Sequence, residues 1–161
     1  MSGSVDNSAR VWDVSTSEEL KELKGHTHWV VSVMFSSDGM QIVSGSFDNS
    51  VWLWDVSTGV ELKELRGHSG WVNSVALSDG MWIVSGSMDN SVRVWDASTG
   101  VEMKELKELK GHTGSINLVS FSSDGTHIAS VSSSYYSSVQ VWNASTGVEL
   151  KELKSPTINS W

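Results

Sequence analysis

The chain has 161 residues, of which 39% are hydrophobic and 19% charged, and its formal net charge at pH 7 is −8. This length and composition fit one soluble globular domain. The acidic balance argues against nucleic acid and anionic membrane surfaces as partners, because both attract basic protein faces. Without cysteine, the chain has no disulfide, thiolate nucleophile or cysteine metal site. Neither a signal peptide nor an apolar stretch of ~20 residues is visible, so we expect a cytoplasmic protein.

Two dipeptides recur along the chain at nearly constant spacing. The first occurs three times, at spacings of 42 and 44 residues: Gly25-His26, Gly67-His68 and Gly111-His112. The second occurs at spacings of 42, 41 and 47 residues: Trp12-Asp13, Trp54-Asp55, Trp95-Asp96 and Trp142-Asn143. A fixed period of this length is typical of stacked structural units, each of which buries its apolar surface against its neighbours.

Four β-rich runs separated by turn residues fill one repeat. In the first complete repeat they are Trp29–Phe35, Ile42–Ser46, Ser50–Trp54 and Val60–Leu65. The sequences between them contain Asp-Gly, Asp-Asn and Ser-Thr-Gly, which favour tight turns. The Lys-Glu-Leu segments are good helix formers, but they are too short to hold a helix alone. We therefore predict four short strands in each repeat.

A period near 42 residues with Gly-His and Trp-Asp landmarks resembles the WD-repeat (WD-40) family. The resemblance implies an all-β propeller made of four-stranded antiparallel blades. It divides a single domain into a partial blade at 1–24, full blades at about 25–66, 67–109 and 111–154, and a tail at 155–161. The repeats are nearly identical in sequence, and in this respect the chain also resembles the WD-repeat tails of fungal heterokaryon-incompatibility-type sensors.

The family resemblance further implies one hydrogen-bonded set of side chains in each blade, made of a His, a turn Asp, a Ser or Thr on the second strand and a Trp. A buried imidazole and a buried indole N–H need such partners on physical grounds as well. The matching residues are His26, Asp48 and Trp54 in one repeat, and His68, Asp89 and Trp95 in the next. The serine is Ser44 or Ser46 in the first set and Ser85 or Ser87 in the second.

The third repeat departs from this pattern. It keeps His112 and Trp142, but its lengthened turn, Ser132–Ser138, contains no Asp. This blade has either decayed or been remodelled for binding.

The sequence gives no reason to expect catalysis. Each repeat has the Ser, His and Asp of a catalytic triad, but their recurrence in successive repeats indicates a structural role. His26 and His28 could begin a metal site, yet no third ligand is evident. The glycines fall in separate turns and form no phosphate-binding loop. We expect no enzyme activity, no cofactor and no metal.

Positions that differ between repeats are free to serve a partner. Two of them, one just after Gly-His and one just before the turn Asp, lie on the upper face of WD-repeat propellers. We predict a binding surface there, formed by Trp29, Phe47, Trp71 and Met88, together with Tyr135 and Tyr136 of the lengthened turn. Aromatic residues and Met are enriched in protein interfaces. The alternative is that these rings pack against neighbouring blades.

These observations favour a protein- or peptide-binding scaffold. One alternative is a glycan or small-ligand binder with several equivalent weak sites, one in each blade. The other is a structural or engineered repeat protein without a ligand.

Three full blades and about half of another fall short of most closed propellers, which have typically four to eight blades. An open arc leaves an apolar blade face bare at each end. Two copies contain the material of a seven- or eight-bladed ring, so we predict self-association as a head-to-tail homodimer. The alternative is that the chain is a fragment of a longer protein.

Overall fold

A computed structural model describes residues 1–79, 82–99, 109, 111–133 and 138–154 of the chain. All regular secondary structure in this part is β-strand, arranged as four antiparallel sheets of three or four strands. The predicted all-β fold with propeller-type blades is therefore confirmed. No helix that could cross a membrane occurs among these residues.

The four sheets follow one another along the chain without exchanging strands. The first consists of β1 (Ser2–Gly3), β2 (Ser8–Trp12) and β3 (Glu19–Lys24). The second consists of β4 (Val30–Phe35), β5 (Gln41–Ser46), β6 (Ser50–Asp55) and β7 (Glu61–Arg66). The third contains β8 (Val72–Leu77), β9 (Trp82–Ser87) and β10 (Val92–Asp96), and Leu109 bridges to Val92 at its edge. The fourth consists of β11 (Ser115–Phe121), β12 (His127–Ser133), β13 (Ser138–Asn143) and β14 (Glu149–Lys154).

The turns between strands use residues that tolerate a left-handed backbone. Asn49 and Asn90 have φ angles of 70° and 69° in the Asp-Asn turns, and Gly39 has a φ of 71° in the turn after β4. Asn and Gly adopt this conformation at lower cost than other residues. The repeated turn sequences thus fix where each strand ends and in which direction the next one returns.

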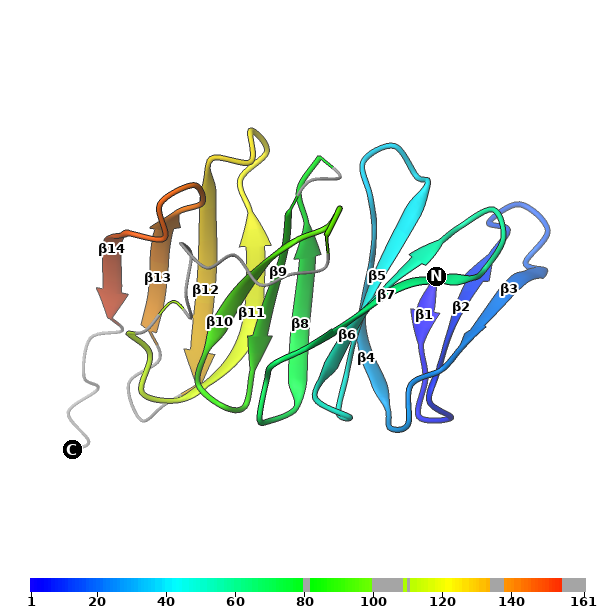
Figure 1. Cartoon of the computed structure of the whole chain (residues 1–161), viewed down its shortest axis with the longest axis horizontal. Coiled ribbons are helices and arrows are strands. Elements are labelled where there is room, and N and C mark those ends of the chain that lie inside the picture. The colour runs from blue at the N-terminus through cyan, green and yellow to red at the C-terminus, as the bar shows by residue number, and fades with distance from the viewer. Residues whose placement is uncertain (80–81, 100–108, 110, 134–137, 155–161) are drawn as a thin grey trace, which may run out of the picture.

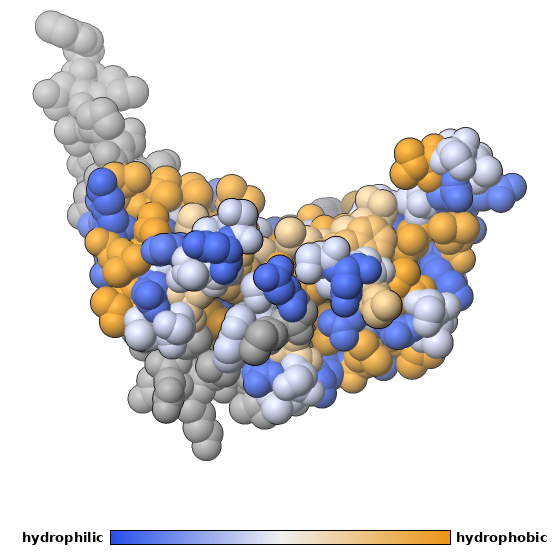
Figure 2. All heavy atoms as spheres, turned by 90° about the horizontal axis from the view of Figure 1, so that it is seen from above, coloured by the Kyte–Doolittle hydropathy of each residue, from blue (hydrophilic) through white to orange (hydrophobic). Residues whose placement is uncertain are grey.

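The sheets stand side by side in chain order and form an open arc over the described residues (Figure 1). Seen from above, the body is curved (Figure 2). Neighbouring sheets meet through their first strands, where the amide of Val75 donates to Ser32 Oγ at 3.0 Å and that of Val119 to Ser74 Oγ at 3.1 Å. The upper face is the edge where these first strands begin; it is drawn at the bottom of Figure 1.

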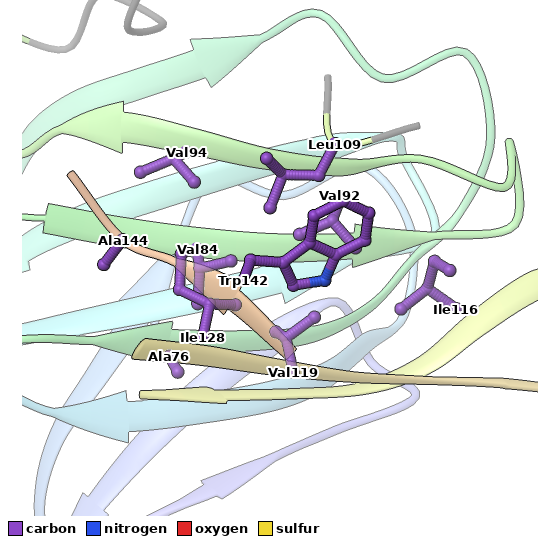
Figure 3. Close-up of a cluster of buried hydrophobic side chains, with 10 residues drawn as sticks. All are labelled: Ala76, Val84, Val92, Val94, Leu109, Ile116, Val119, Ile128, Trp142 and Ala144. Carbon is purple, nitrogen blue, oxygen red and sulfur yellow. The ribbon is translucent and has the colours of Figure 1, made fainter. Parts of the chain in front are cut away.

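Three hydrophobic clusters fill the spaces between the sheets. Alternate residues of β6 serve two of them, because Trp54 packs toward the first sheet and Leu53 toward the third. In the cluster between the third and fourth sheets, the Trp142 indole lies among Val92, Val119 and their neighbours (Figure 3). The inner sheets are therefore apolar on both faces, and each stabilises the next.

The outer faces of the two end sheets have no such neighbour among the described residues. Trp12 is 39% exposed, whereas the equivalent Trp54 is 1% exposed. At the other end Leu153 is 48% exposed, whereas the equivalent Leu65 is 1% exposed. The same repeat positions are thus buried inside the arc and uncovered at its ends.

Two leucines of β7 test this packing with one kind of substitution. Leu65 is 1% exposed and Leu62 is 44% exposed. We expect Leu65→Ala to lower the free energy of unfolding by about 2–5 kcal/mol, the usual cost of a large-to-small change in a core. We expect Leu62→Ala to cost less than about 1 kcal/mol. Urea unfolding measures both, and equal losses would contradict the packing described here.

Candidate functional site

The side chains that define each repeat form a closed hydrogen-bonded set below the upper face. In the second sheet, His26 Nδ1 lies 2.8 Å from Asp48 Oδ2, and His26 Nε2 lies 2.8 Å from Ser44 Oγ. Trp54 Nε1 donates to the same Ser44 oxygen at 2.8 Å. An imidazole that donates to Asp48 and accepts from Ser44 leaves no buried group in the set unpaired.

The third sheet repeats this geometry closely. His68 lies 2.9 Å from Asp89 and 2.7 Å from Ser85, and Trp95 donates to Ser85 at 2.9 Å. Of the serines that the sequence left open, Ser44 and Ser85 fill the position. Ser46 and Ser87 instead donate to backbone oxygens of the loops before β4 and β8.

A further serine in each set was missed by sequence reasoning. Ser50 Oγ donates to Asp48 Oδ1 at 2.5 Å and lies 3.3 Å from the His26 ring. Ser91 takes the same place beside Asp89, at 2.6 Å. The signal was present in the sequence, because Asp-Asn-Ser recurs at these turns.

The fourth sheet keeps the set without a carboxylate. His112 contacts Ser130 at 2.7 Å and Ser138 at 3.0 Å, and Trp142 donates to Ser130 at 2.9 Å. Ser138 occupies the repeat position of Ser50, so a hydroxyl takes over the contact that Asp makes elsewhere. Burial lowers the pKa of His112, and the charge of Glu152 opposes this only in part. Tyr135 and Tyr136 of this turn lie outside the described residues.

Burial of Asp48 and Asp89 opposes their ionisation, but hydrogen bonds outweigh it. Asp48 accepts from His26, from Ser50 and from the amide of Thr27, and together these bonds hold its pKa well below the ordinary value. The corresponding bonds lower the pKa of Asp89. Both side chains are therefore carboxylates at neutral pH, pinned a short distance below the upper face.

Four of the predicted binding residues lie at this face, and three of them form one aromatic row. We call the side chains of Trp29, Phe47 and Trp71 the aromatic row. The rings of Phe47 and Trp71 are stacked, with centroids 4.3 Å apart and an interplanar angle of 12°. The Trp29 ring also stacks with the Phe47 ring, and their centroids are 5.9 Å apart. His28 lies beside all three rings, at 5.5 to 6.4 Å.

Backbone hydrogen bonds hold the loops that carry this row. The amide of Phe47 donates to the Trp29 carbonyl at 3.0 Å, and that of Met88 donates to the Trp71 carbonyl at 2.9 Å. Trp29, Trp71 and Met88 remain 45%, 44% and 46% exposed. The rings thus pack on one another across two sheets and still present nearly half of each indole to solvent. At the repeat position of the tryptophans, the fourth sheet has Ser115.

The described residues contain no group of three or more His, Asp or Glu side chains that could hold a metal ion. His26 and His28 point to different surroundings. The first is bound within the buried set, whereas His28 Nδ1 accepts from the amide of Trp29 at 2.7 Å.

The carboxylates give the fold a pH dependence with a defined sign. A folded-state pKa below the unfolded value of about 4 contributes stability that is present above pH 4 and is lost as the pH falls through the folded pKa. We expect the double variant Asp48→Asn/Asp89→Asn to be less stable at pH 7 and to lose less stability between pH 5 and about pH 2. Urea unfolding at several pH values measures this. Glu18→Gln, an exposed change outside the sets, is the control, and an unchanged pH slope in the double variant would refute the interpretation.

Comparison with known proteins follows the same repeats. Residues 17–55, 59–96 and 103–143 match the family model described as WD domain, G-beta repeat. Ribosome assembly protein 4 of Saccharomyces cerevisiae is 43% identical over 44 residues, which cover 27% of this chain and 8% of that protein. Its namesake in Chaetomium thermophilum is 51% identical over 37 residues, 23% of this chain and 7% of the relative. The matched region therefore spans less than a tenth of either relative. Because the family model covers more than half of the chain, this chain belongs to the WD40 family of β-propeller repeat proteins.

Proposed function

We propose that this chain is a non-enzymatic recognition module that binds a protein or peptide on its upper face. WD-repeat proteins generally act as scaffolds for protein interactions. The observation that carries the proposal is the aromatic row, whose rings are stacked and held by backbone bonds while its two indoles stay nearly half exposed. Rigid, exposed aromatic residues are the usual anchors of protein interfaces.

The hydrogen-bonded sets support a role without catalysis. His26, His68 and His112 are only 6%, 7% and 8% exposed, and each has partners on both ring nitrogens. A catalytic base must reach its substrate. These imidazoles are occupied in holding strands together.

The distribution of aromatic residues favours one extended site over several equivalent ones. The row crosses from the second sheet to the third, and Ser115 replaces the tryptophan in the fourth. A glycan binder with one site in each blade would need a similar platform in every repeat. The similarity to the ribosome assembly proteins covers about one repeat, so it supports the repeat unit and carries no information about the partner.

We further propose that a second copy of the chain covers the bare end faces, as in a head-to-tail homodimer. The outward side of the last sheet carries five apolar residues that are at least partly exposed: Ala129, Val131, Val139, Val141 and Leu153. On the first sheet, Trp12 and the 98% exposed Val14 take the positions that Trp95 and Ala97 occupy inside the arc. Apolar faces of this kind are buried wherever a neighbouring sheet is present.

A random peptide library displayed on phage tests the upper-face proposal. We expect selection on the wild-type chain to enrich peptides that lose binding to Trp29→Ala and Trp71→Ala. Met40→Ala is the matched control, because Met40 is 68% exposed on the opposite edge. Selected peptides that bind all three variants equally, or the absence of enrichment, would contradict an upper-face site.

A further inference from the structure

We infer that the aromatic row receives arginine side chains of a basic peptide segment. This rests on the proposed function and adds the chemistry of the partner. A guanidinium stacks on the face of an indole ring, since its planar charge is weakly hydrated and is attracted by the ring quadrupole. Trp29 and Trp71 offer two such rings, each nearly half exposed.

The row is ordered before any partner binds. Stacking of Phe47 on Trp71 at 4.3 Å fixes one side of the row, and the amide of Met88 bonded to the Trp71 carbonyl fixes the loop beneath it. On the other side, His28 lies 5.5 Å from Trp29 and bonds to its amide. A platform held in this way loses little conformational entropy on binding, so a single stacked side chain can contribute measurably.

Charge decides between a basic and a purely apolar partner. The loops of the upper face, residues 4–7, 25–29, 47–49, 67–71, 88–91 and 111–114, contain three carboxylates and no Lys or Arg. Two of the carboxylates, Asp48 and Asp89, directly follow Phe47 and Met88 in the chain, and hydrogen bonds keep both ionised. The third, Asp6, is paired with Arg10. Of the three basic residues directly before Gly-His, Lys24 and Arg66 are each paired with a glutamate of their own strand, and Lys110 lies outside the described residues.

The carboxylates of Asp48 and Asp89 attract a ligand cation through their electrostatic field and not through a direct ion pair. Both oxygens of Asp48 already accept hydrogen bonds, from His26, the Thr27 amide and Ser50. A ligand cation would therefore gain its contact energy from the exposed rings, while the fixed negative charge and the net charge of −8 draw it toward this face. This combination favours Arg over Lys, because the ammonium group holds its water more strongly.

Four matched peptides test the inference by fluorescence anisotropy. Each is a fluorescein-labelled Gly-Ser peptide of one length with two variable positions, occupied by Arg, Lys, citrulline or Leu. Citrulline keeps the size and planarity of Arg but lacks its charge. We expect the Arg peptide to bind at least fivefold more tightly than the citrulline and Leu peptides, and more tightly than the Lys peptide.

The variants separate stacking from general attraction to an acidic chain. We expect Trp29→Ala and Trp71→Ala each to weaken binding of the Arg peptide roughly fivefold or more. Met40→Ala should bind the Arg peptide as tightly as the wild-type chain does. Circular dichroism confirms that each variant is folded. Equal binding of the Arg peptide to the tryptophan variants would show nonspecific attraction and overturn the inference, as would failure of the Arg peptide to bind. The inference would also be overturned if the citrulline or Leu peptide bound as tightly as the Arg peptide and lost binding to the tryptophan variants. That result would still support a peptide site on the upper face.

Discussion

The structure depends on sheets that are apolar on both faces. One side of β6 buries Trp54 and the other buries Leu53, so a single sheet of this kind exposes a hydrophobic surface whichever way it turns. Only stacking against two neighbours removes that surface from water. The hydrophobic clusters between successive sheets follow from this constraint, and so do the exposed positions at the two ends of the arc.

The hydrogen-bonded sets satisfy the polar groups that this stacking buries. Each joins the loop before the first strand to the second and third strands through one serine oxygen, at Ser44, Ser85 or Ser130. Because these residues are engaged with one another, they repeat with little change. The upper-face positions are not part of these sets, and there the repeats differ: the fourth sheet has Ser115 at the position of Trp29 and Trp71. Within a single repeat, the positions that hold the fold are thus distinct from the positions of the proposed binding surface.

The sequence allowed the strands to be predicted from the repeated turns, and the resemblance to the WD-repeat family implied most of each hydrogen-bonded set. It could not decide between Ser44 and Ser46, since residues two apart lie on the same face of a strand. The structure resolves the choice, because Ser44 Oγ lies 2.8 Å from both His26 Nε2 and Trp54 Nε1. The contact of Phe47 with Trp71 also could not be predicted from the sequence. That contact joins two blades, and the distance between blades depends on how their side chains interdigitate.

The proposal that a second copy covers the bare end faces is tested most directly by the mass of the protein in solution. Light scattering on a sizing column, over a range of concentrations, should give twice the 17.5 kDa of one chain. Val139→Lys should reduce the mass to that of one chain by charging the outer face of the last sheet, whereas Leu62→Lys on the exposed side of an inner blade should not. A wild-type mass of 17.5 kDa at every concentration would contradict the account, because the bare end faces would then remain uncovered.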